Sequence, residues 1–292
     1  MRRLAVIDPA VRLSPLDLSD DHELLTSEDG EAVAVVSPQH TDPDSYPGLW
    51  VDTDVHRVQV RCTGDADAAA LTGMLSSAFT VLGEQRPAHL VSASRDMVLT
   101  RPLLRAGYAP TTVLALHRLP ATPPEAVPDA VHVRLATLED LEVLVAAAVA
   151  VQAFDGRVGV LPDRPGAADV FRQETASALR EHPGWAWVAE QDGAVVGVCE
   201  MEPPESAGWV TGWVNPPADG LTTAYLGMLH VDPGARGRGT GAALVRAAHA
   251  RALEAGAGQV VLHHAAVNPL SVPFWGRAGY RPLLTGWARH GG

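Results

Sequence analysis

The stretch 225–254 constrains the fold of this chain more than any other. It reads as an apolar strand from Tyr225 to Val231, a turn at 232–234, a glycine-rich loop, and a helix from Ala242 to about Glu254. The helix repeats apolar residues at helical spacing. Glycines let the backbone turn its N–H groups toward one point, which the unpaired N–H groups and the positive dipole end of the helix also face. The stretch therefore predicts an anion site, most often one for phosphate.

The loop, Arg236 to Gly241, limits which phosphate this is. It contains no Lys, so it is not a P-loop, and its three glycines have the wrong spacing for a dinucleotide fingerprint. A glycine-rich turn before an ordinary helix is the simplest alternative. The pattern Arg-x-x-Gly-x-Gly follows a strand that ends Leu-His-Val-Asp-Pro. This closely resembles the acyl-CoA pyrophosphate loop of the GNAT N-acetyltransferase superfamily.

The resemblance extends along the chain in the superfamily's element order, from about 131 to 289. Downstream come a strand at Gln259–Ala265, then Asn268 and a short helix with Phe274 and Trp275. Upstream, residues 131–135 and the capping pair of Thr137 and Asp140 resemble the first strand and helix. The resemblance implies an α/β fold, with a mixed, mainly antiparallel central sheet flanked by helices and splayed at the acyl-CoA site.

The first part of the chain contains a segment similar in sequence to a segment of the second part, as in an internal repeat. Residues 89–108 align with 261–280 without gaps, and both end Arg-Ala-Gly-Tyr. We therefore expect two tandem GNAT-like domains, 1–120 and 131–292, joined by a proline-rich linker at 121–130. The arrangement resembles mycothiol-synthase-like tandem acetyltransferases of actinobacteria. In the first domain Cys62–Asp67 replaces the phosphate loop, and its two carboxylates would repel a pyrophosphate. We expect that domain to be structural or substrate-lining.

The resemblance implies direct transfer of an acetyl group from acetyl-CoA to a primary amine in a ternary complex, without a metal. It implies that the pantetheine arm pairs with the strand backbone and that an N–H near residues 229–231 stabilises the thioester oxyanion. The implied acyl-CoA contacts are Met228, Leu229, His230, Val231, Arg236, Gly237, Arg238, Gly239, Thr240, Gly241, Asn268, Ser271 and Trp275.

The general base and acid stay open at this stage. His264 titrates in the useful range and is our first candidate, although a core histidine is as good an explanation. Tyr225 stands where several family members have a Glu, but a tyrosine is a poor base at neutral pH. Glu200 and its neighbour Glu202 are the third candidates. The simpler explanation for them is that they lie at a strand end exposed to solvent. Trp275 stands at the family's acid position, and its indole will not give up a proton. That leaves water or Tyr280.

Composition excludes several classes of function. The net charge is −12 and every basic residue is Arg, which disfavours nucleic acid as a partner. No apolar run is long enough for a membrane span. Two cysteines and no evident signal peptide suggest the cytoplasm. The sequence does not decide between a monomer and a homodimer. Three functions remain possible: an acetyltransferase of small molecules or peptides, a non-catalytic acyl-CoA-binding or regulatory protein, and a scaffold.

Overall fold

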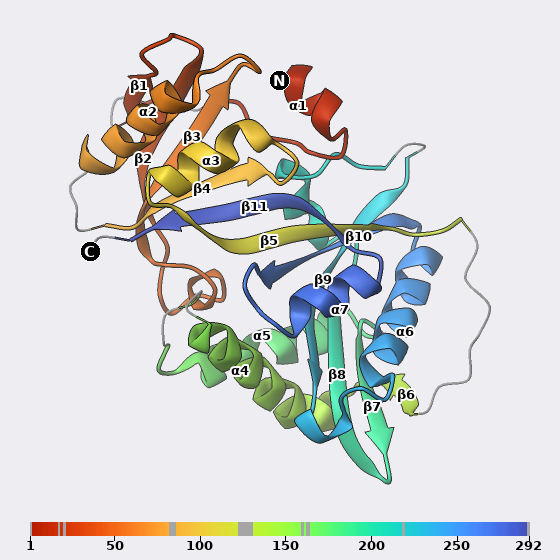
Figure 1. Ribbon diagram of the computed structural model, residues 1–292. Coiled ribbons are helices and arrows are strands. Elements are labelled where there is room, and N and C mark those ends of the chain that lie inside the picture. Colours follow the sequence, from red (N-terminus) through yellow and green to blue (C-terminus); the bar gives the residue numbers. More distant parts are fainter. Residues whose placement is uncertain are drawn as a thin grey trace.

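The computed structural model describes residues 2–16, 18, 19, 22–81, 86–121, 131–158, 161, 164–217 and 220–290. Their strands form one eleven-stranded sheet in the order β1-β2-β3-β4-β11-β5-β10-β9-β8-β7-β6, with helices on both faces (Figure 1). Two neighbouring pairs, β3–β4 and β9–β10, are parallel, and the others are antiparallel. The predicted mixed, mainly antiparallel sheet flanked by helices is confirmed.

The second half of the chain builds one end of the sheet. Its capping box is confirmed, because the Thr137 hydroxyl accepts the Glu139 N–H and Asp140 accepts the Thr137 N–H. Asp192 and Gly193, an Asp-Gly pair typical of hairpin turns, connect β7 to β8, and both residues have positive φ. Its elements are β6 (His132–Leu135), η2 (Leu138–Asp140), α4 (Leu141–Arg157), α5 (Ala167–Glu181), β7 (Ala186–Gln191), β8 (Ala194–Glu202), η3 (Ala207–Gly212), β9 (Thr222–Val231), η4 (Pro233–Ala235), α6 (Thr240–Glu254), β10 (Ala257–Ala265), α7 (Ser271–Arg277) and β11 (Arg281–Arg289).

The first half builds the other end, where α2 and α3 pack on strands β2 to β4. Its elements are α1 (Arg2–Ile7), β1 (Glu23–Thr26), β2 (Ala32–His40), η1 (Pro47–Leu49), β3 (Asp54–Cys62), α2 (Ala68–Val81), β4 (Ala88–Ala93), α3 (Met97–Arg105) and β5 (Ala109–Arg118). Most of the proline-rich linker predicted at 121–130 lies outside the described residues.

The two halves exchange their last strands. β11 of the second half lies between β4 and β5, and β5 of the first half lies between β11 and β10. The exchange is symmetric. Val91 of β4 pairs with Gly286 of β11, and the residues 172 positions away in the other half, His263 of β10 and Leu114 of β5, pair in the same way. The halves therefore share one sheet, and the division at 120/131 stays a prediction.

Strand alternation assigns each face of the second half to different helices. Trp187 and Ala189 of β7 face the cluster with α6, whereas Ala186 and Val188 face the cluster with α4 and α5. On the second of these faces, α4 continues to Arg157 and α5 begins at Ala167. Within the described residues, no helix is long and apolar enough to cross a membrane.

Candidate active site

The parallel strands β9 and β10 separate part-way along their length. Their pairing ends where Tyr225 meets Val261, and beyond this point β10 pairs with β5 alone. On its other side β9 stays paired with β8 up to Val231, with a bulge at Gly227. Among the described strands, none covers the inner edge of β9 from Leu226 to Val231. Its backbone groups can therefore pair with an extended ligand, as at other open sheet edges.

The predicted strand contacts divide between the two faces of this edge. Met228 is buried against α4 and α5, whereas Leu229 and Val231 pack against the α6 cluster. His230 Nε2 lies 3.3 Å from Asp232 Oδ1, and both residues line a hollow of about 380 Å³ between α4 and the ends of β8 and β9. Side chains thus fix the strand on both faces while its inner edge stays open.

The glycine loop connects this strand to α6. Gly237 and Gly239 have φ angles of 74° and 88°, in the left-handed region that favours glycine, and a Cβ on either would meet nothing within 4 Å. The Ala243 N–H donates to Gly239 O (2.9 Å), so the N–H groups before it, from Thr240 on, begin the helix without an intrahelical acceptor. Arg236 Nε donates to Val231 O (2.9 Å), which ties the loop to the strand. The loop fits an anion.

Helix α7 lies against the start of α6. A Cβ on Gly241 would meet the Phe274 ring at 3.1 Å, so the two helices pack at glycine distance. Asn268 accepts N–H bonds from Leu270 and Ser271, and its amide donates to Asp155 of α4 (2.8 Å). The Ser271 hydroxyl is buried without a hydrogen-bond partner among the described residues, as expected for a group that meets a ligand.

The aromatic residues at the predicted acid position lie in the core. Trp275 is 6% exposed and packs edge-on against Phe274 and Tyr280. The Tyr280 hydroxyl lies 2.7 Å from His249 Nε2, and burial raises the pKa of Tyr280 well above its usual value. Both rings serve packing, and neither supplies an acid that reaches the open strand edge.

A group of polar and aromatic residues, here called the Tyr225 cluster, lies where β9 and β10 separate. The Tyr225 hydroxyl is 3.1 Å from His263 Nδ1, and the Trp209 ring of η3 stacks parallel to the His263 ring. Trp209 Nε1 donates to Glu202 Oε2 (2.9 Å), and Glu202 pairs with Tyr225 across the sheet. Desolvation by the surrounding side chains lowers the pKa of His263, although the residue is partly open to solvent, so its imidazole is neutral at pH 7.

Glu200 completes this cluster. It lies two residues before Glu202 on β8 and pairs with Met228, which places its side chain on the α4–α5 face. Its Oε1 is buried without a hydrogen-bond partner among the described residues. Burial raises the pKa of Glu200 to about 7. A carboxyl with this pKa takes up and releases a proton near neutral pH.

Tyr46 brings the first half of the chain to the same place. It packs edge-on against Phe171 of α5, and burial followed by the charges of Glu200 and Glu202 raises the pKa of its hydroxyl. No motif or pattern in the sequence singles out Tyr46 or Trp209, because each comes to this place only through the packing of segments that are distant along the chain.

His264 lies on the opposite side of β10 from the Tyr225 cluster. Leu262, two residues earlier, packs in the α6 cluster, and alternation puts His264 on the same face. Its Nδ1 lies 3.0 Å from Ala265 O. Burial lowers its pKa, while the Ala265 carbonyl and the charge of Asp155 oppose that effect. The catalytic role of His264 stays a prediction.

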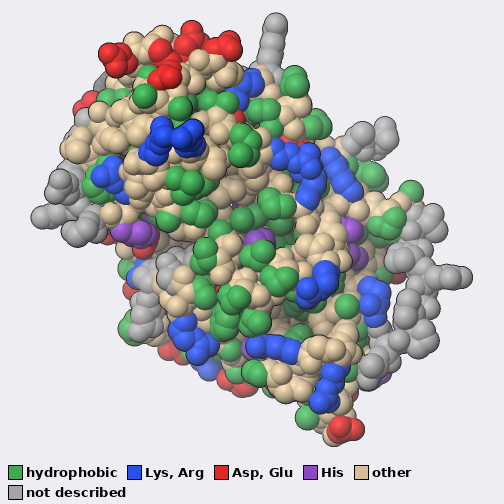
Figure 2. Space-filling model, in the orientation of Figure 1, with side chains coloured by type: hydrophobic (Ala, Val, Ile, Leu, Met, Phe, Trp, Pro, Cys, Tyr) green, Lys and Arg blue, Asp and Glu red, His purple; other side chains and the backbone are tan. Residues whose placement is uncertain are grey.

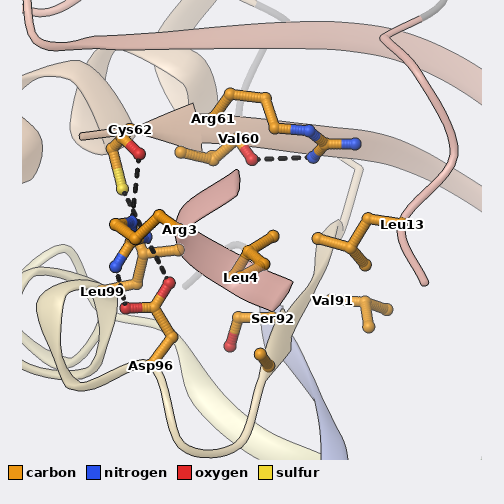
Figure 3. A pocket seen from close by; sticks show the side chains of 11 residues that line it. Arg3, Leu4, Leu13, Val60, Arg61, Cys62, Val91, Ser92, Asp96 and Leu99 are labelled. Atoms are coloured by element: carbon orange, nitrogen blue, oxygen red, sulfur yellow. Dashed lines mark hydrogen bonds and ion pairs between the residues drawn. The ribbon is translucent and has the colours of Figure 1, made fainter. Parts of the chain in front are cut away.

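The first half has an equivalent separation of strands, between β3 and β4 after Val58 and Leu90. There α1 fills the gap (Figure 3). Arg3 forms a bidentate ion pair with Asp96 and donates to Cys62 O (3.3 Å), and Leu4 lies between the strand ends. The chain's own first helix thus occupies the place that is open between β9 and β10.

Acidic side chains gather beside this filled gap. Figure 2 shows them together at the upper end of the first half, near α2. Exposed carboxylates there include Asp29, Glu31, Asp65 and Asp67, and Asp67 N donates to Asp29 Oδ2 (2.7 Å). Negative charge at the start of α2 disfavours a phosphate, in contrast to the glycine loop before α6.

The comparisons with known proteins agree with this geometry. Residues 161–280 match the acetyltransferase (GNAT) family. The fold is similar to a GCN5-related N-acetyltransferase from Sphaerobacter thermophilus, at 17% identity and a TM-score of 0.58, over 94% of this chain and 82% of that one. It is also similar to a GNAT-family acetyltransferase from Colwellia psychrerythraea, at 12% identity and a TM-score of 0.51, over 98% and 93%. Among curated proteins, none matches the chain.

Proposed function

We propose that this protein is an N-acetyltransferase that transfers an acetyl group from acetyl-CoA to a primary amine in a ternary complex. The observation that carries the proposal is the open inner edge of β9 leading directly into a glycine loop and the start of α6. An extended pantetheine arm can pair with the first, and a pyrophosphate can bind the second. The family match over 161–280 includes both features.

The residues fit acyl-CoA from the phosphate end to the thioester. The N–H groups of Gly237 to Gly241 and the guanidinium groups of Arg236 and Arg238 bind the pyrophosphate. Backbone groups between Met228 and Val231 hold the pantetheine. A backbone N–H of this edge stabilises the negative charge that develops on the thioester oxygen.

The reaction forms a C–N bond and breaks the C–S bond. The amine nitrogen attacks the thioester carbon, and the amine proton passes to a base. We assign the base to Glu200, because its carboxyl lies in the Tyr225 cluster with an unpartnered oxygen and a pKa of about 7. The leaving thiolate takes its proton from water, since Trp275 and Tyr280 are buried in the core. Tyr225 and His263 hold the amine in place.

The experiment that tests this function combines binding with turnover. Calorimetry measures the affinity for acetyl-CoA, and a thiol reagent measures release of CoA in the presence of an amine. We expect binding of acetyl-CoA and amine-dependent thiol release. An absence of acetyl-CoA binding would refute the site itself.

One observation favours a second function, that of a non-catalytic acyl-CoA-binding protein. The acid position holds Trp275, which is buried and packed, so this chain lacks the family's usual proton donor. Under this function acetyl-CoA binds through the same loop, and no amine increases thiol release above the rate in buffer.

A further inference from the structure

The Tyr225 cluster has the electrostatic character of a cation site. The charges that act on the Tyr46 hydroxyl come from Glu200, Glu202 and Glu174, and all three are negative. Glu202 raises the pKa of Tyr225 in the same way, after the larger effect of burial. Glu202 itself is held by Trp209 Nε1, whereas Glu200 Oε1 has no partner among the described residues. A bound ammonium ion would satisfy that oxygen, because a buried carboxylate oxygen without a partner is costly.

The rings of the cluster suit an apolar or aromatic group beside that cation. Trp209 is 46% exposed, although its indole N–H is fixed by Glu202, so its ring face is presented to solvent in a set orientation. Its centroid is 4.8 Å from that of Tyr225 in an edge contact. An ordered and exposed aromatic ring next to carboxylates binds cations and flat apolar groups.

The first half of the chain contributes Tyr46, which is close enough to Tyr225, Glu200 and Glu202 for their charges to act on one another. The segment around Tyr46 is anchored to the second half by two side chains that bind its backbone. Gln152 of α4 donates to Leu49 O (2.9 Å), and Arg164 Nε donates to Gly48 O (3.1 Å). A Cβ on Gly48 would meet Asp42 O, so the turn that carries Tyr46 closes tightly. The second half therefore holds the Tyr46 segment of the first half in a fixed position.

Resting on the proposed function, we propose that the acceptor is a primary amine on an apolar or aromatic skeleton that carries no carboxylate; it binds as its ammonium ion and loses one proton to solvent before its nitrogen attacks. Glu200 and Glu202 bind the ammonium group, and Trp209, Tyr225 and Tyr46 enclose the skeleton. An α-carboxylate would lie beside the same ammonium group and meet these two glutamates, and like charges at such distances are unfavourable. The site therefore selects simple amines over amino acids of the same shape.

Phenethylamine and L-phenylalanine test this selection, because they differ only by the carboxylate. Their binding to the full chain saturated with CoA is measured by calorimetry. We expect phenethylamine to bind at least about 10-fold more tightly, the size of one charge-assisted contact. Glu202→Gln keeps an acceptor for Trp209 Nε1 and removes one negative charge. It should therefore weaken the binding of phenethylamine and reduce the ratio of the two ligands' affinities.

Glu205→Gln is the matched control, since Glu205 is an exposed carboxylate in the turn after β8. It should leave both affinities unchanged. Equal binding of the two ligands, or an unchanged ratio in Glu202→Gln, would overturn the inference. If other amines are acetylated in that case, the proposed function still stands. If phenethylamine binds selectively but no amine is acetylated, the proposed function fails and the cation site remains.

Discussion

Replacement of Glu200 by Gln separates the proposed catalytic role of this carboxyl from the cost of burying it. The difference between the ordinary pKa of 4.5 and about 7 in the folded chain corresponds to about 3 kcal/mol. Because the folded-state pKa is raised, the unfolded chain releases this proton first as the pH rises. Stability is therefore lost from about pH 4.5 to about pH 7 and is level above that range.

Glu200→Gln should remove that pH dependence. Urea unfolding gives the free energy of unfolding at pH 5 and at pH 8. Between these two pH values the variant should gain about 2–3 kcal/mol of this free energy relative to the wild type. Its kcat should fall by about 10²-fold or more, and the rise in the wild-type rate through about pH 7 should disappear. Glu205→Gln serves as the control for both measurements. A folded Glu200→Gln variant with full kcat would refute the assignment of Glu200 as the general base. An unchanged dependence of stability on pH in the variant would refute the burial of its carboxyl group.

Three further predictions concern the cosubstrate and the alternative base. Gly239→Asp should abolish acetyl-CoA binding in calorimetry while the protein stays folded, because it puts a negative side chain into the phosphate site. Gly193→Asp is the control, because this hairpin position has a φ of 78° and the substitution causes similar backbone strain; this variant should bind acetyl-CoA normally. Titration should give one acetyl-CoA per chain, because α1 fills the gap in the first half, and two equivalent sites would contradict this reasoning. His264→Ala should lose about 1–3 kcal/mol of stability and keep kcat within a few-fold, whereas a fall of about 10²-fold would return the base to His264.

The elements were predictable where one local pattern decides them. The strand before the glycine loop, the capping box of Thr137 and the hairpin at 192–193 follow from short-range rules of capping and turn chemistry. The sequence predicts that this helix begins at Ala242, whereas α6 begins two residues earlier, because Thr240 and Gly241 belong to the helix as well as to the glycine-rich pattern.

The pairing of strands could not be predicted in this way. Periodicity marks a segment as a strand, but it carries no information on the partners of that strand. The repeat between 89–108 and 261–280 indicated equivalent units, and the symmetric register follows from that equivalence. The exchange of strands does not follow from a prediction of two tandem domains, because that prediction gives each domain its own last strand.

The acceptor side of the site was the least predictable part. Tyr46 and Trp209 come from segments more than 160 residues apart, and Tyr46 reaches Phe171 of α5 only because the first half folds against α4 and α5. Glu200 ranked below His264 because sequence gives no measure of burial. The unpartnered oxygen of Glu200 and its raised pKa are properties of the folded chain.

The most direct test of the central claim is thiol release from acetyl-CoA over a broad panel of primary amines. Mass spectrometry of the amine runs beside it, and Gly239→Asp serves as the blank. We predict that the wild type releases CoA in step with an acetylated amine, and that the blank does not. Acetyl-CoA binding by calorimetry, without thiol release above the blank for any amine, would contradict the account and leave an acyl-CoA-binding protein.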